Sequence, residues 1–130
     1  MRVLLDTNVV IDLARSPEVL RVETLERLGS DATTLVLPVV AAWEISIKWR
    51  LGKLRLPDHP NRWVPQAVRS FGAEVLVASL EHVTRVADLP DHHKDPFDRL
   101  LIAQAQVEGI PIVTADRSFA AYDVEVITAR

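Results

Sequence analysis

The 130-residue sequence contains no cysteine, and this absence excludes a disulfide scaffold, a thiolate metal site and a cysteine nucleophile. No apolar run approaches the ~20 residues that a membrane-spanning helix needs. Arg2 is followed by only three apolar residues before Asp6, which is too short for the apolar segment of a signal peptide. We therefore expect a cytoplasmic protein that does not associate with a membrane.

The chain also lacks an excess of positive charge, because 15 Lys and Arg residues stand against 18 Asp and Glu residues and the formal net charge is -3. General binding to polyanions is therefore excluded, and any contact with nucleic acid needs a local basic patch or a cation held by acidic residues. Hydrophobic residues make up 48% of the chain, which is enough for a substantial core. The length suits one compact domain, which we place at 1–130.

Short apolar runs alternate with amphipathic segments along the chain. The run Val3-Leu4-Leu5 has no polar face, which is typical of a strand buried on both sides in a parallel sheet. We expect further strands at 34–37, 74–78, 110–114 and 125–127. Helices are expected at 7–14, 17–28, 39–51, 60–71, 80–87 and 96–108, with a short helical turn at 117–120. This alternation predicts an α/β fold, a three-layer α/β/α sandwich with a central, mostly parallel five-stranded sheet.

Two acidic residues lie just after predicted strands. Asp6 directly follows the first strand, and Asp116 follows the fourth strand by two residues. In open α/β sheets, ligands bind beyond the carboxyl ends of the strands, so these carboxylates stand where chemistry is expected. Asp116 is equally explained as the N-cap of the helical turn at 117–120.

A third acid, Glu44, is predicted on the face of a helix that packs against the sheet. It shares a stripe with Val40, Ile47 and Leu51. Burial of its charge is costly unless the carboxylate is paired or binds a metal. The alternative is a glutamate at the edge of the stripe that reaches solvent.

The segment Asp95-Pro96-Phe97-Asp98 opens another helix, because proline is favoured at the first helical position. Asp95 is then the N-cap, a role that needs no catalytic explanation. Asp98 shares a face with Leu101 and Ile102 and is therefore expected to point inward.

Four carboxylates gathered at one sheet edge would repel one another, and a bound hard cation removes this repulsion. Ligands that are all oxygen select Mg²⁺ or Mn²⁺ rather than zinc. Such a site fits metal-assisted hydrolysis of phosphodiester bonds. We therefore predict a metal-binding catalytic set that consists of Asp6, Glu44, Asp98 and Asp116.

Four segments, in the order in which they occur along the chain, resemble the PIN-domain family, and within it the VapC-type toxins of bacterial toxin–antitoxin pairs. They are Leu4–Asn8, Ala42–Ile45, Asp95–Ala103 and Val113–Asp116, and the run Trp43–Pro57 is similar to one VapC subgroup. The resemblance covers nearly the whole chain. It implies a Mg²⁺- or Mn²⁺-dependent endoribonuclease that cleaves RNA, is inhibited by a small antitoxin protein, and forms a homodimer or a toxin–antitoxin hetero-oligomer.

The resemblance also assigns roles to individual residues. The four acids of the family map onto Asp6, Glu44, Asp98 and Asp116. Asp95 matches an extra acid of the subgroup and is given an accessory role. Asn8 and Thr114 match polar positions that hold the carboxylates.

Several basic residues lie near these acids in the sequence. Candidate contacts to RNA phosphates are Lys48, Arg50, Lys53, Arg55, Lys94 and Arg99. Solvated helix ends and surface ion pairs explain the same residues equally well. His92 and His93 are interpreted as loop residues, because the chain has no cysteine and no second spaced histidine pair. Trp49 is interpreted as packed under a neighbouring segment, although an exposed tryptophan there would indicate a protein interface.

Other functions compete with the nuclease. An aspartyl-phosphate phosphatase also has Leu-Leu-Asp at a strand end, but its chemistry needs a second Asp where this chain has Asn8. A non-catalytic protein-binding module would use the acidic cleft to hold an arginine of its partner. A nucleotide-cofactor domain is disfavoured, because no glycine-rich loop follows the first strand.

Overall fold

Five short strands form one sheet, in which every neighbouring pair is parallel and the order is β3-β2-β1-β4-β5. In chain order they are β1 (Arg2–Leu5), β2 (Thr34–Pro38), β3 (Glu74–Leu76), β4 (Ile112–Thr114) and β5 (Val126–Thr128). The computed structural model describes the whole chain, residues 1–130. Because β1 is the central strand, its carboxyl end lies between those of β2 and β4.

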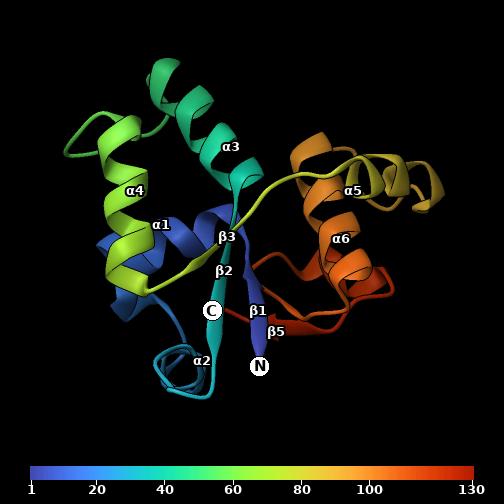
Figure 1. Cartoon of the computed structure of the whole chain (residues 1–130), viewed down its shortest axis with the longest axis horizontal. Coiled ribbons are helices and arrows are strands. Elements are labelled where there is room, and N and C mark those ends of the chain that lie inside the picture. The colour runs from blue at the N-terminus through green and yellow to red at the C-terminus, as the bar shows by residue number, and fades with distance from the viewer.

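Helices cover both faces of the sheet (Figure 1). One layer holds α1 (Thr7–Arg15), α2 (Val22–Leu28) and α4 (Pro60–Phe71), and the other holds α5 (Leu80–Arg85) and α6 (Pro96–Glu108). The remaining helix, α3 (Val39–Arg50), continues directly from the carboxyl end of β2. The prediction of a three-layer sandwich around a parallel five-stranded sheet is confirmed.

The central strand explains why the layers close on both sides. Alternate residues of a strand face opposite sides of a sheet. Val3 and Leu5 belong to one buried cluster, which also contains Val9 and Val10 of α1, Leu28 of α2 and Trp63 of α4. Leu4 belongs to a second buried cluster with Leu101 and Ile102 of α6. A strand covered on both sides needs apolar residues at every position, which accounts for the run at 3–5.

The helix expected at 17–28 is divided, so that prediction is wrong in part. A 3₁₀ turn, η1 (Pro17–Val19), is separated from α2 by an extended Leu20 and Arg21. The Arg21 amide donates to the Ala129 carbonyl at 2.8 Å, and the Thr24 hydroxyl donates to the Thr128 carbonyl at 2.6 Å. The Arg21 hydrogen bond takes the place of a helical one, and the Thr24 hydrogen bond holds α2 against the C-terminal segment. Local periodicity gives no sign of either.

Other element boundaries differ by a few residues. The strands β3 and β4 are shorter than expected, and β5 begins one residue later. The helix expected at 80–87 is α5 followed by the 3₁₀ turn η2 (Val86–Asp88), and the turn expected at 117–120 is η3 (Arg117–Ala121). At β4 the cause is Pro111, whose nitrogen has no hydrogen to donate to a neighbouring strand.

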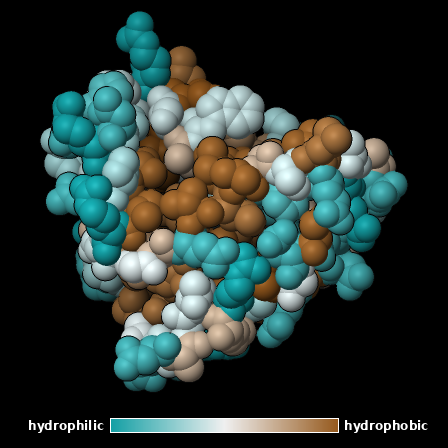
Figure 2. All heavy atoms as spheres, viewed as in Figure 1, coloured by the Kyte–Doolittle hydropathy of each residue, from teal (hydrophilic) through white to brown (hydrophobic).

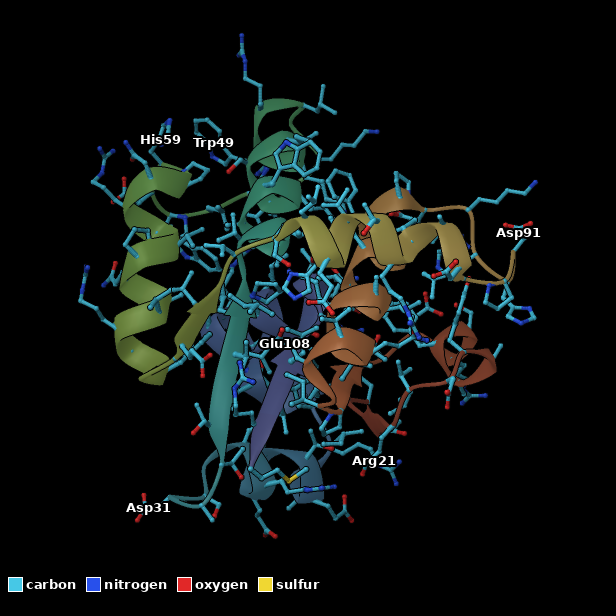
Figure 3. All side chains as sticks on the ribbon, turned by 45° about the vertical axis from the view of Figure 1, so that its right-hand side comes forward. Arg21, Asp31, Trp49, His59, Asp91 and Glu108 are labelled. Carbon is cyan, nitrogen blue, oxygen red and sulfur yellow. The ribbon has the colours of Figure 1, made fainter.

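Two helices end where glycine predicts it. Gly52 follows the end of α3 with φ +74°, and Gly109 follows the end of α6 with φ +65°. This left-handed conformation is strained for residues that carry a Cβ. The last turn of α3 is further held by Trp49, whose ring meets that of His59 edge-on at a centroid distance of 4.7 Å (Figure 3). Trp49 is half-buried by this contact, so it is only partly packed under the segment that precedes α4.

The far end of α6 is tied to the amino end of the sheet. Glu108, labelled in Figure 3, accepts a hydrogen bond from His82 Nε2 at 3.0 Å and one from Arg2 of β1 at 3.4 Å. The hydrogen bond from His82 is the main cause that lowers the pKa of Glu108. These contacts orient α6 so that its first turn, with Asp98, lies at the carboxyl edge of the sheet.

None of the helices combines the length and the apolar character that crossing a membrane requires.

Candidate metal centre

The structure brings the four predicted acids together at the carboxyl edge of the sheet. Asp6 follows β1, Asp116 follows β4, Glu44 comes from α3 and Asp98 comes from the first turn of α6. Charges on Glu44 and Asp116 act on Asp6, and charges on Asp6 and Glu44 act on Asp98. Acids that are up to 110 residues apart in the chain therefore share one electrostatic environment.

Asp6 is buried, with 5% of its surface exposed, and both its oxygens are held. Oδ1 accepts from the Thr7 amide at 2.7 Å, and Oδ2 accepts from the Thr114 hydroxyl at 2.7 Å. Burial raises the pKa of Asp6, and the charges of Glu44 and Asp116 raise it further against the effect of the two hydrogen bonds. Thr114, one of the predicted accessory residues, thus contacts Asp6 directly.

Glu44 is also buried, with 6% of its surface exposed, as its place on the inward stripe predicted. Oε1 accepts from the Thr7 hydroxyl at 2.7 Å, and Oε2 lies 2.8 Å from Nζ of Lys48, one turn further along α3. The hydrogen bond to Glu44 is the main cause that raises the pKa of Lys48. Lys48 therefore points toward the acids rather than outward along the basic segment.

Among the four acids, Asp98 has the pKa that this environment raises most. Burial raises the pKa of Asp98 to about 7, with further contributions from the charges of Asp6, Asp95 and Glu44. Asp95 caps the helix as predicted, because Oδ1 accepts from the amides of Phe97 at 2.8 Å and Asp98 at 3.2 Å. Asp95 thus fixes the first turn from which Asp98 projects.

Asp116 is the most exposed of the four acids and caps η3. Its Oδ1 accepts from the amide of Ser118 at 2.9 Å and from the hydroxyl of the same residue at 2.7 Å. Burial alone would raise the pKa of Asp116, but the hydrogen bonds from Ser118 and His93 hold it below its ordinary value. Two of the acids thus resist ionisation, while Asp116 favours it.

His93 also lies in the site, and the interpretation of this residue as an ordinary loop histidine is wrong. Its Nε2 lies 2.9 Å from Oδ2 of Asp98 and 3.2 Å from Oδ2 of Asp116. One atom from each of these three residues falls within 4.8 Å of the other two. His92 stays at the surface, with its ring edge-on to that of Tyr122 at 5.2 Å.

Two further predictions need correction. Asn8 is exposed and its side chain makes no hydrogen bond, while the preceding residue, Thr7, holds Glu44. Arg99 does not reach outward to a phosphate, because its guanidinium donates to backbone carbonyls of the preceding loop. The remaining predicted phosphate contacts, Arg50, Lys53, Arg55 and Lys94, are exposed.

The donor set fits a hard divalent cation. The four acids offer carboxylate oxygens, the ligands that Mg²⁺ and Mn²⁺ prefer. Beyond the effect of burial, the charges of Glu44 and Asp116 raise the pKa of Asp6, and the charges of Asp6, Asp95 and Glu44 raise the pKa of Asp98; a bound cation would offset this repulsion.

The family model described as PIN domain matches residues 3–125, and the chain belongs to the PIN domain family. Among solved structures, VapBC2 from Rickettsia felis, bound to a DNA fragment from its promoter, aligns over 100% of both chains with a TM-score of 0.76 and 14% identity. DNA-bound VapBC from Salmonella typhimurium aligns over 98% of both chains, with a TM-score of 0.70 and 16% identity. A toxin–antitoxin complex from Klebsiella pneumoniae covers 97% of this chain and 96% of that chain, with a TM-score of 0.65 and 20% identity. At these identities the likeness shows the fold. No curated protein matches the chain in sequence.

Proposed function

We propose that this chain is the toxin of a toxin–antitoxin pair and acts in the cytoplasm as a Mg²⁺- or Mn²⁺-dependent endoribonuclease. The observation that carries the proposal is the convergence of four carboxylates at the carboxyl edge of the sheet in a PIN-domain chain, two of them buried. Lys48 pairs with the buried Glu44, but the buried Asp6 is held only by neutral donors, so the cost of burying its charge is one that a bound cation would offset.

The ion would be held by Asp6, Glu44, Asp98 and Asp116. When bound, a divalent cation lowers the pKa of the attacking water and neutralises charge on the scissile phosphate. Thr7 and Thr114 orient the buried carboxylates through their hydroxyl groups. In metal sites, hydrogen-bond partners of this kind fix the orientation of the ligands before the ion binds.

Basic residues around the site would contact the RNA backbone. Lys48 is half-exposed beside Glu44, and Lys53, Arg55 and Lys94 are exposed. Each is suited to a phosphate contact, because ammonium and guanidinium groups displace counterions from nucleic acid. Arg99 is excluded from this set by its backbone contacts.

A protein partner is part of the proposal. The similar structures include VapBC complexes and a toxin–antitoxin complex, which supports an antitoxin as the partner. The chain also exposes a large apolar surface, seen as the brown area in the centre of Figure 2. Its exposed apolar residues include Val39 and Val75, which lie along a groove between α3, α4 and β3. Contiguous apolar surfaces of this kind are typical of protein interfaces.

The test is cleavage of a mixed RNA pool by the purified protein with Mg²⁺, with Mn²⁺ and with chelator, beside two variants. Asp6→Asn removes a proposed ligand. Asp31→Asn is the matched control, because Asp31 is exposed and lies at the opposite end of the sheet (Figure 3). We expect metal-dependent cleavage by the wild type and by Asp31→Asn and none by Asp6→Asn. Equal cleavage by Asp6→Asn would contradict the assignment, and a lack of both cleavage and metal binding in the wild type would favour the protein-binding module.

A further inference from the structure

The loop before α6 carries His93 into the site, and Arg99 fixes the path of this loop. Nη1 of Arg99 donates to the Pro90 carbonyl at 2.8 Å, and Nη2 donates to the carbonyls of Leu89 at 3.2 Å and Val86 at 3.3 Å. Because Arg99 follows Asp98 directly, these contacts tie the loop to the turn that presents the Asp98 carboxylate. The side chain of Asp91, at the tip of the loop, is fully exposed and points away from the molecule (Figure 3), whereas the adjacent Pro90 is held by Arg99.

The position of the ring proton of His93 follows from a backbone contact. The amide of Asp95 donates to Nδ1 of His93 at 3.1 Å. A backbone amide only donates, so Nδ1 carries no proton and the proton of the ring lies on Nε2. The ring of Phe119 meets the His93 ring edge-on, with centroids 6.1 Å apart, and further limits its rotation.

The Nε2–H group therefore points into the gap between two of the proposed ligands. Nε2 donates to Oδ2 of Asp116 at 3.2 Å and lies 2.9 Å from Oδ2 of Asp98. One carboxylate belongs to α6 and the other to the segment after β4, and no other side chain bridges these two acids. The imidazole is thus the direct link between two elements that must hold their carboxylates at a fixed spacing.

We propose that His93 is a positioning residue of the metal centre, whose Nε2–H donates to Asp116 and lies against Asp98, and that it does not itself bind the metal. The inference rests on the proposed metal-dependent function. Metal binding through Nε2 would require the ring proton to move to Nδ1, where it would face the amide hydrogen of Asp95. Two donors would then oppose each other, whereas the donor role keeps both nitrogens satisfied.

The first test is calorimetric titration of Mn²⁺ into the wild type and three variants. His93→Ala removes the bridge, and we expect Mn²⁺ affinity to fall about ten-fold or more, as is typical when a residue that orients metal ligands is lost. His93→Gln places an amide N–H near the position of Nε2 and is expected to stay within about three-fold of the wild type. His92→Ala is the matched control in the same loop and should not change the affinity.

The second test separates a donor from a ligand. Electron spin echo envelope modulation on the Mn²⁺-loaded wild type detects nitrogen bound to the metal. We expect no imidazole nitrogen coupling, and this readout does not depend on whether His93→Ala folds. A nitrogen coupling that is present in the wild type and lost in His93→Gln would overturn the proposal, because His93 would then be a ligand.

The outcomes also separate this inference from the proposed function. Equal Mn²⁺ affinity of the wild type and a folded His93→Ala variant would overturn the role of His93 alone. A wild type that binds no divalent ion would overturn the metal centre, and the role of His93 with it.

Discussion

Asp98 points inward, and both its burial and the neighbouring acids oppose its ionisation. Burial and the charge of Asp6 raise its pKa to about 7, from 3.8 in a solvated carboxyl group. The folded protein therefore binds a proton at Asp98 that the unfolded chain releases near pH 3.8. The stabilising contribution of this proton is complete below about pH 3.8 and is lost as the pH rises through 7.

The metal-free protein should accordingly lose stability between pH 5 and pH 8, and Asp98→Asn should remove much of this loss. Because the Asp98 side chain is only 16% exposed, we expect the variant to be more stable at pH 8 by on the order of 1–3 kcal/mol. Asp6 acts in the same direction, whereas the lowered pKa of Asp116 matters only in acid. Urea unfolding in chelator at both pH values measures the effect. An unchanged pH dependence in Asp98→Asn would show that this carboxyl is not buried among acids.

Thr114 connects two of the acids through one hydroxyl, which donates to Asp6 at 2.7 Å and accepts from the Asp116 amide at 3.0 Å. Thr114→Val keeps the shape and removes both hydrogen bonds, so we expect a loss of stability of about 1–2 kcal/mol. Cleavage of RNA should fall about ten-fold, because Asp6 loses the group that orients it. Thr128→Val, at an exposed position of β5, is the control. Wild-type kcat in Thr114→Val would contradict the orienting role.

The helix α6 both supports the sheet and presents the proposed ligand Asp98, and Asp95 caps its first turn. Asp95→Ala should destabilise the protein by about 1 kcal/mol, because the amides of Phe97 and Asp98 lose their acceptor. Asp95→Asn retains the cap, since Asn and Asp are similarly good N-cap residues. Thermal unfolding and Mn²⁺ titration of both variants separate the two roles. A large loss of Mn²⁺ affinity in Asp95→Asn would show that the carboxylate acts on the metal as well as on the helix.

Arg99 fixes the path of the loop before α6, so substitutions of Arg99 and His93 should have non-additive effects on Mn²⁺ affinity. Arg99→Lys cannot donate to three carbonyls in the same geometry, so the loop should loosen and His93 should lose its position. We expect Arg99→Lys to weaken Mn²⁺ binding in the wild type and to have little further effect in His93→Ala. The measurement is a double-mutant cycle by calorimetry. Fully additive losses would mean that Arg99 acts on the site by a route other than His93.

At the scale of the whole molecule, regular patterns in the sequence predicted the sheet, its layers and the four acids. The run at 3–5 identified a doubly buried strand, and Asp6 at its end identified the functional edge, because parallel strands end together. The helical period placed Glu44 on the inward stripe of α3.

The residues that the sequence did not place correctly depend on irregular backbone. Asn8 and Thr7 are neighbours just after Asp6, and only the direction of the first turn of α1 decides that Thr7 faces Glu44 while Asn8 faces solvent. His93 stands in a loop without periodicity, whose path is set by side-chain contacts of Arg99 to carbonyls up to 13 residues away. One signal was available in the sequence: a histidine two residues before the N-cap Asp95 and five before Asp98 lies within reach of the helix start.

The metal centre is tested most directly by the number and affinity of Mn²⁺ ions that the wild type and Asp98→Asn bind. Both follow from the electron paramagnetic resonance signal of free Mn²⁺. Asp91→Asn is the control, because Asp91 is fully exposed at the tip of the neighbouring loop (Figure 3). We expect saturable binding by the wild type and by Asp91→Asn, and at least about a ten-fold loss of affinity in Asp98→Asn. Equal binding by all three proteins, or no saturable binding by the wild type, would contradict a metal centre built from these carboxylates.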